Sequence, residues 1–120
     1  MVIIFAQVCS ARPPGYEYGL ASWYGTEQLR RNHHRPMANG QKYDPHKMTA
    51  ASDRYPLGTV LEVTNLDNGE RVVVTVTDRG PREDLGRLVD VSEAAAKALG
   101  FERAGLTNVA VTIRRYKEES

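Results

Sequence analysis

Hydrophobic residues alternate with polar ones in three short stretches of the chain, at 61–63, 71–77 and 109–113. This period of two is the pattern of a β-strand that buries one face. Between the first two stretches, Asp67-Asn68-Gly69 predicts a hairpin turn, because Asn and Gly tolerate a positive φ. Residues 87–91 predict a further short strand. The pattern therefore predicts a mainly β domain.

Residues 92–100 predict one short helix. Ser92 can cap its N-terminus, and Glu93 places a negative charge in the first turn, where it complements the helix dipole. The segment 94–99 consists of strong helix formers, and Gly100 supplies the left-handed stop. A helix of about two turns is not stable without packing. We therefore expect a small barrel of short strands that carries one helix.

Residues 1–18 predict a tail that does not belong to the fold. An apolar run over 1–8 is too short to span a bilayer, but it is typical of the hydrophobic part of an export signal. Cys9 and a linker rich in Pro and Gly follow, which favours lipid attachment at Cys9. The alternative is a frayed tail with an inert thiol. We expect the barrel domain over 19–116 and a polar tail over 117–120.

Composition excludes several classes of function. The 120 residues suffice for one domain, and 16 Lys and Arg against 15 Asp and Glu give a net charge of +1, so nucleic-acid binding by general charge is not expected. A single cysteine excludes an intrachain disulfide and a thiolate zinc site. His33, His34 and His46 lack a carboxylate at ligand spacing, so no metal site is expected, and the segment around the first two is interpreted as a solvated basic loop.

Four segments carry candidate chemistry. Asp78 begins an Asp-Arg-Gly-Pro turn after the valine-rich strand, where its carboxylate either bonds backbone amides or acts as an acid at the edge of a groove. Asp90 lies within a predicted strand and needs a structural or functional partner. Trp23 is either a core residue or, beside Tyr24, a surface on which sugar rings stack. Ser52 has no G-x-S-x-G setting, which argues against a serine hydrolase.

Seven segments, taken in their order along the chain, resemble the rare lipoprotein A family of bacterial cell-wall proteins. They cover nearly everything from residue 19 to residue 113. The resemblance implies a single six-stranded double-psi β-barrel with one or two short helices. The segments are Gly19-Leu-Ala-Ser-Trp-Tyr-Gly25, Ala38-Asn-Gly40 with Tyr43-Asp44, Leu57-Gly-Thr59, Val63-Thr-Asn-Leu-Asp-Asn-Gly69, Val76-Thr-Asp-Arg-Gly-Pro81, Arg87-Leu-Val-Asp-Val-Ser92 and Ala94-Ala-Ala-Lys-Ala-Leu-Gly100.

The family includes endolytic lytic transglycosylases, which cleave peptide-free glycan strands of peptidoglycan during cell-wall remodelling and septation. The resemblance thus implies a non-hydrolytic reaction that leaves 1,6-anhydro ends and needs no cofactor. The implied partners are peptidoglycan glycan strands, with no nucleic acid and with membrane contact only through a lipid anchor on Cys9. We expect a monomer that is exported to the bacterial periplasm or cell envelope.

The resemblance also assigns site residues, and two of them are substituted. The family's aspartate is retained as Asp78, but Gln41 stands at the position of its acidic residue and Ser52 at the position of its histidine. Neither Gln nor Ser donates a proton near neutral pH, so weakened or lost activity is expected. From the matching segments we expect substrate contacts at Tyr24, Asn39, Tyr43, Arg79 and Asp90.

A second hypothesis is a non-catalytic module that binds peptidoglycan. Plant expansins share the barrel, keep an aspartate in a setting similar to that of Asp90, and loosen wall polysaccharides without cutting them. Asp78 and Asp90 would then hold a glycan in the same manner. A third hypothesis is a protein-interaction barrel that keeps only the scaffold.

Overall fold

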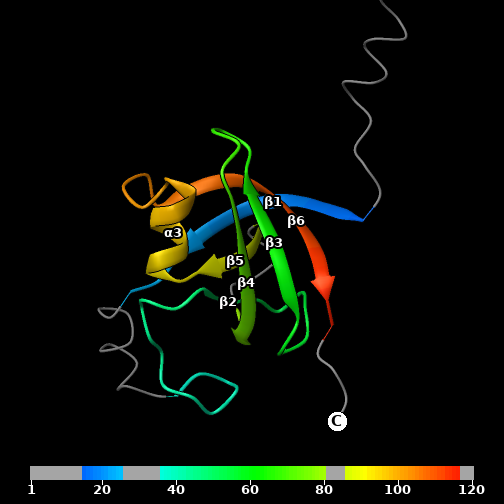
Figure 1. The fold of residues 1–120 in the computed structure, drawn as a ribbon, viewed down its shortest axis with the longest axis vertical. Coiled ribbons are helices and arrows are strands. Elements are labelled where there is room, and N and C mark those ends of the chain that lie inside the picture. The colour runs from blue at the N-terminus through cyan, green and yellow to red at the C-terminus, as the bar shows by residue number, and fades with distance from the viewer. Residues whose placement is uncertain (1–14, 26–35, 81–85, 117–120) are drawn as a thin grey trace, which may run out of the picture.

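Six strands form a closed barrel in this computed structural model, which describes residues 15–25, 36–80 and 86–116 (Figure 1). Around the barrel the strands follow the order β1-β5-β2-β4-β3-β6. The elements are β1 (Tyr16–Trp23), β2 (Thr49–Ala51), β3 (Val60–Asn65), β4 (Arg71–Asp78), β5 (Arg87–Val91), α3 (Glu93–Leu99) and β6 (Leu106–Arg115). The prediction of a mainly β, six-stranded barrel is confirmed.

The barrel mixes parallel and antiparallel pairs. β1 pairs with β5 and β2 pairs with β4 in parallel, whereas the four remaining pairs are antiparallel. The predicted hairpin is present as β3 and β4, and Gly69 in its turn has a φ of 79°, which only glycine adopts without strain. Figure 1 shows this turn at one end of the molecule and the carboxyl end of β4 at the other.

The alternating hydrophobic positions fill the barrel. On β3, Leu61 and Val63 are fully buried while their neighbours are half-buried, as the period of two predicted. The inward valines of β4 and β6 are likewise buried, but Ile113 is only half-buried near the end of its strand. Trp23 packs against this core and donates from its indole Nε1 to the carbonyl of Glu102 over 3.0 Å, so it is mainly a packing residue.

Helix α3 has the caps that its sequence predicted. The hydroxyl of Ser92 accepts a hydrogen bond from the Ala95 amide over 3.3 Å, and Gly100 ends the helix with a φ of 81°. The buried face of the helix carries two alanines and a leucine that belong to the barrel core. Figure 1 places α3 beside the carboxyl ends of β1 and β5. No helix of the described residues is long and apolar enough to cross a membrane.

β1 begins at Tyr16, three residues before the predicted start of the domain at Gly19. Its first residues pair with β6, where Tyr16 lies opposite Thr112 and Tyr18 lies opposite Ala110. The first three residues of this strand were not predicted, because the composition before Gly19 is typical of a linker. These residues form a strand by pairing with β6, about 90 residues away in sequence. Cys9 lies outside the described residues, so its lipidation stays a prediction.

Candidate functional site

The short strand β2 brings the two predicted aspartates to the same region. Ala51 pairs with Asp90 on β5 and with Asp78 on β4. The Cα atoms of Asp78 and Asp90 are thus separated by two strand spacings, about 10 Å. A register shift between Ala50 and Ala51 lets Asp78 pair here, although a regular alternation with the buried valines of β4 would aim it into the core.

Asp78 is held at the end of β4 by main-chain donors. Its Oδ1 accepts hydrogen bonds from the amides of Ala38 and Arg79, each over 2.9 Å. The amide of Asn39 also donates to the carbonyl of Thr77 over 3.1 Å, so the turn at 36–41 docks against the end of β4. This confirms that the carboxylate of Asp78 bonds backbone amides. Its Oδ2 has no hydrogen-bond partner among the described residues, so the lone pairs of one oxygen are not used by them.

Gln41 lies exposed in the same turn and is bonded to Asn39 twice. Its Oε1 accepts from the Asn39 side-chain amide over 3.1 Å, and its own amide donates to Asn39 Oδ1 over 2.9 Å. Gln41 therefore lies close in the fold to Asp78, as its assignment requires. It presents an amide to solvent where the family resemblance implies an acid.

Ser52 is completely buried, with 0% of its surface exposed. Its hydroxyl donates to the carbonyl of Leu88 over 2.9 Å and accepts from the amide of Arg54 over 3.0 Å. Its amide donates to the carbonyl of Asp78 over 3.0 Å. Ser52 thus joins the ends of β2, β4 and β5. Its hydroxyl is bonded inside the fold and is not exposed to solvent.

Asp53 is a residue that the sequence analysis did not place in the site. Its Oδ1 accepts from the Gly80 amide over 2.7 Å, which brings a second carboxylate, itself exposed, beside the turn that begins at the half-buried Asp78. The contact joins residues 27 positions apart, and no local pattern predicts it. Asp53 therefore adds a second hydrogen bond that fixes this turn, besides the one from Ala38 to Asp78.

Two buried tyrosines lie beside the aspartates. The rings of Tyr24 and Tyr43 are 4.7 Å apart between centroids, and Ala51 and Met37 pack with them. The hydroxyl of Tyr43 donates to the Tyr24 carbonyl over 2.7 Å and accepts from the Glu93 amide over 3.1 Å. Tyr43 therefore fastens the segment before β2 to β1 and to the start of α3.

The pKa of Tyr24 is raised well above its usual value, first by burial and then by the charge of Asp78, with smaller effects from Tyr43 and Asp90. Burial is also the main cause that raises the pKa of Tyr43. Tyr24 thus lies within electrostatic range of both aspartates and stays neutral at ordinary pH. Because both rings are buried, neither offers an open face, and their predicted contacts with substrate stay predictions.

Asp90 has the structural partner that the sequence left open. Arg87 Nη2 donates to both of its carboxylate oxygens, over 2.6 and 2.8 Å, and the hydroxyl of Ser22 donates to its Oδ1. Only 15% of the Asp90 side chain and 30% of the Arg87 side chain are exposed. By contrast, the exposed Arg79 side chain has no partner among the described residues. A substrate contact by Asp90 or Arg79 stays a prediction.

No group of three potential metal ligands occurs among residues 15–25, 36–80 and 86–116. His46 is exposed, and its amide donates to Asp44 Oδ1 over 2.9 Å. His33 and His34 lie outside the described residues. The described chemistry at this end of the barrel thus consists of carboxylates, amides and buried phenols.

A closed barrel of six strands with this mixed pairing, and a short helix after β5, defines a double-psi β-barrel. The family described as lytic transglycolase matches residues 16–111. The chain therefore belongs to the lytic transglycolase family of double-psi β-barrels. The predicted family membership of the chain is confirmed.

Curated relatives are similar over most of this chain. It is 45% identical over 95 residues to a probable endolytic peptidoglycan transglycosylase RlpA of Synechocystis sp., covering 79% of this chain and 28% of the relative. It is 44% identical over 102 residues to the endolytic peptidoglycan transglycosylase RlpA of Vibrio cholerae, covering 84% and 37%. The Pseudomonas aeruginosa RlpA is 48% identical over 93 residues, covering 78% and 26%. The chain thus spans roughly a quarter to a third of the length of these relatives.

Solved structures with low sequence identity share the fold. The Streptomyces papain inhibitor superposes with a TM-score of 0.65 at 20% identity, covering 85% of this chain and 96% of that one. An expansin of Clavibacter michiganensis superposes with a TM-score of 0.59 at 23% identity, covering 87% and 52%. At these identities the likeness concerns the barrel alone.

Proposed function

We propose that this barrel acts on the glycan strands of bacterial peptidoglycan as a lytic transglycosylase, with Asp78 as its reacting carboxyl group. The observation that carries the proposal is the setting of Asp78: two main-chain amides fix one carboxylate oxygen, and the other has no partner among the described residues. A carboxyl group held in this way at a strand end is positioned in advance for acid–base chemistry. The relatives named above are endolytic peptidoglycan transglycosylases, which supports the choice of substrate.

The proposed reaction consumes no water. The protonated carboxyl of Asp78 gives its proton to the glycosidic oxygen, and the bond between that oxygen and the anomeric carbon of the muramoyl sugar breaks. The C6 hydroxyl of the same sugar forms a new bond to this carbon and releases its proton to the Asp78 carboxylate. The products are a free hydroxyl end and a 1,6-anhydro end, and the acid is regenerated.

The substitutions at two family positions favour a second candidate, a non-catalytic module that binds or loosens the wall. Gln41 carries an exposed amide bonded to Asn39, and the Ser52 hydroxyl is used inside the fold. Neither group exchanges a proton near neutral pH. In this alternative the open oxygen of Asp78 accepts a hydrogen bond from a sugar hydroxyl, and the strand stays intact.

Digestion of purified, peptide-free glycan strands tests the proposal. We expect mass spectrometry to find 1,6-anhydro ends with the unmodified protein and none with Asp78→Asn. Glu70→Gln, which alters an exposed carboxylate in the turn at the far end of β4, is the matched control and should digest normally. Anhydro ends produced equally by Asp78→Asn would overturn the role of Asp78.

Two further measurements separate the candidates. Absence of anhydro ends, together with retention of the protein on insoluble peptidoglycan, would support the binding module, and failure of both would leave the interaction scaffold. Gln41 is exposed, so Gln41→Glu fits without repacking and should raise any anhydro production. Ser52→His must instead displace the Ser52–Leu88 hydrogen bond in a fully buried position. If Gln41→Glu combined with Ser52→His creates no activity, this end of the barrel has diverged beyond its two missing groups.

The place of action follows from the substrate. A protein that acts on peptidoglycan works in the cell envelope, which requires export. We infer the same location for this chain, with a lipid on Cys9 as a further proposal, testable by labelling with a fatty-acid analogue in cells and comparison with Cys9→Ser. A monomeric state and a role in septation also belong to the proposal. Sedimentation of the purified chain and fluorescence localisation in dividing cells test them.

A further inference from the structure

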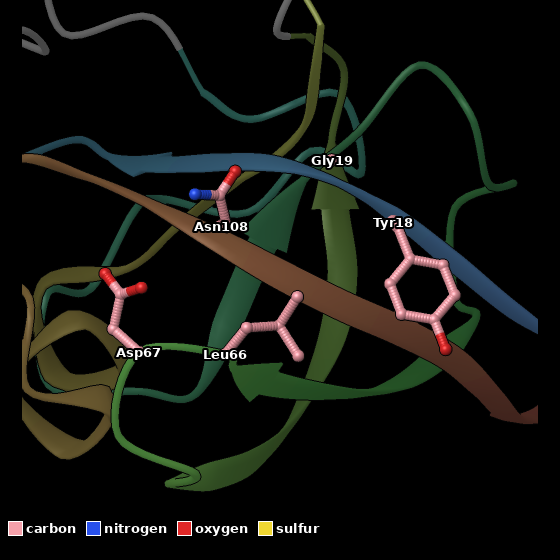
Figure 2. A pocket seen from close by; sticks show the side chains of 5 residues that line it. All are labelled: Tyr18, Gly19, Leu66, Asp67 and Asn108. Atoms are coloured by element: carbon pink, nitrogen blue, oxygen red, sulfur yellow. The ribbon is translucent and has the colours of Figure 1, made fainter. Parts of the chain in front are cut away.

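A hollow lies on the outer surface of the barrel, near the turn between β3 and β4. It has a volume of about 410 Å³ and is lined by Tyr18 and Gly19 from β1, Leu66 and Asp67 from the turn, and Asn108 from β6 (Figure 2). The range for ligand pockets is about 300–1,000 Å³. Asp78 is the last residue of β4, whose carboxyl end lies opposite this turn (Figure 1), and none of these five lining residues belongs to the site described above.

The pairing of β1 with β6 explains why the surface is hollow here. Tyr18 lies opposite Ala110, whose small side chain leaves room for the tyrosine ring on the outer face. The amide of Leu66 donates to the carbonyl of Asn108 over 2.9 Å, which brings the turn against β6. Figure 2 shows the Tyr18 ring extending from β1 across β6, with Leu66 between Tyr18 and Asp67 in this view.

Gly19 closes the hollow from β1 by its backbone alone. A Cβ at this position would lie 2.8 Å from Leu88 Cγ and 3.1 Å from the carbonyl oxygen of Gly86, so the packing of β1 on β5 excludes a side chain. Gly19 lies opposite the fully buried Val109, so this side chain would point inward, and Gly19 contributes only main-chain atoms to the hollow.

The lining favours a neutral ligand rich in hydroxyl groups. It holds one aromatic ring, one amide that donates and accepts, and one carboxylate that accepts. The Thr107 hydroxyl donates to Asn65 Oδ1 over 2.8 Å and also reaches Asp67 Oδ2 over 3.1 Å, while Asp67 Oδ1 has no partner among the described residues. None of the described residues that line the hollow is cationic, so the charge that an anionic ligand would meet among them is that of Asp67, which repels it.

We propose that this hollow is a second carbohydrate site, which binds an uncharged N-acetylhexosamine unit of a glycan strand by stacking on Tyr18 and by hydrogen bonds to Asn108 and Asp67. Aromatic faces suit sugar rings, and the polar groups set their orientation. The carboxylate of Asp67 disfavours a muramoyl unit, because that sugar carries its own carboxylate. A peptide is the less suitable occupant, since the six described strands close on themselves and offer no free edge.

Such a site binds a part of the strand that the Asp78 site does not process. It goes beyond the proposed function, because binding here does not depend on bond cleavage. A strand held at both ends of the barrel gains affinity through effective concentration, whereas a short oligosaccharide occupies either site alone. The two sites are therefore separable by experiment.

Titration of the ¹⁵N-labelled chain with the tetramer of N-acetylglucosamine tests the site. We expect amide resonances of residues 18, 19, 66, 67 and 108 to shift together in Asp78→Asn as in the unmodified protein. Tyr18→Leu and Asn108→Ala should each weaken this binding about tenfold. Asn108 has an exposed side chain with no partner among the described residues, so its removal tests binding without a change in packing.

Tyr116→Ala is the matched control, since Tyr116 is an exposed tyrosine just beyond the far end of β6 and should bind the tetramer normally. Shifts confined to residues around Asp78, tetramer binding unaffected by both Tyr18→Leu and Asn108→Ala, or no binding at millimolar tetramer would each overturn the proposal. Loss of anhydro ends in the digestion leaves this titration unaffected, so the two proposals can fail independently.

Discussion

Asp78 and Asp90 lie on either side of the same residue of β2, yet their carboxylates have opposite environments. Asp78 accepts two hydrogen bonds from main-chain amides, both on the same oxygen, Oδ1. No cationic side chain among the described residues is paired with this carboxylate. Asp90 is bound on both oxygens by Arg87 and additionally by Ser22. One carboxylate is fixed but open, and the other is neutralised.

The difference separates a reactive group from a structural one. A carboxylate whose charge is already paired with a guanidinium binds a ligand less strongly, because binding must first break that ion pair. A carboxylate fixed by amides keeps its position and still has lone pairs available. Both aspartates were equally good candidates from the sequence, and the hydrogen bonds of their carboxylates in the structure distinguish them.

Exchanging the carboxylate for an amide should mainly affect activity at Asp78 and mainly affect stability at Asp90. Asp78→Asn keeps an oxygen that accepts from Ala38 and Arg79, so we expect a change of stability within about 1 kcal/mol but a loss of anhydro-end formation of at least about 100-fold. Asp90→Asn leaves the Arg87 guanidinium without its ion pair and should lower the free energy of unfolding by about 2 kcal/mol. Urea unfolding and the glycan digestion measure both. Equal losses of stability would contradict the distinction.

The two arginines provide the same contrast from the cationic side. Arg87→Met leaves Asp90 with an unpaired, mostly buried charge, and we expect about 2–3 kcal/mol of destabilisation in urea. Arg79→Met removes an exposed side chain with no partner among the described residues, and stability should change by less than about 0.5 kcal/mol. Arg54→Met, which breaks an ion pair with Glu17 whose two side chains are 48% and 35% exposed, is the control at below about 1 kcal/mol. Similar losses in all three would show that Arg87 has no special role.

The two tyrosines beside these aspartates should also differ. Tyr43→Phe removes two hydrogen bonds to main-chain groups, one of them to the start of α3, and should cost about 1–2 kcal/mol in thermal or urea unfolding. Among the described residues, the Tyr24 hydroxyl has a weak contact with Met37 Sδ at 3.9 Å and no other partner, so Tyr24→Phe should cost less than about 0.5 kcal/mol. The reverse order would mean that Tyr24 has a structural partner that its geometry does not indicate.

The smallest expected effect appears at high pH. The pKa of Tyr24 is raised in the folded protein by burial and by Asp78, so the folded state keeps a proton that the unfolded chain loses above about pH 10. The contribution is fully present below that pH and is lost as the pH rises toward the folded pKa. We expect the fall in unfolding free energy above pH 10 to be less steep in Tyr24→Phe, as measured by urea unfolding at a series of pH values. An identical slope in both proteins would exclude this coupling.

Elements stabilised by local signals were predictable from the sequence. The hairpin of β3 and β4 has alternating valines and a turn of Asp, Asn and Gly, and α3 has both caps. β2 could not be found in this way, because its three residues are all buried and show no alternation. The parallel pairs and the closure of the barrel came from the family resemblance and not from the pattern of polar and hydrophobic positions.

The candidate site was predictable to a similar extent. The turn at Asp78 has a local signature, and its bonds to amides were among the alternatives. The contact of Asp53 with Gly80 and that of Ser22 with Asp90 join segments far apart in the chain, so no local pattern contains them. The burial of Ser52 follows from its carbonyl partner on β5, which only the assembled barrel provides.

Ser92 joins two elements that are separated in the sequence. Its hydroxyl caps α3 through Ala95 and also donates to the carbonyl of Lys47 over 2.6 Å, while its amide donates to the carbonyl of Thr49 over 2.9 Å. The first turn of the helix therefore cannot open without releasing the start of β2. In hydrogen-exchange terms the two form one cooperative unit, and their slowest amides should exchange at a common rate despite lying about 45 residues apart.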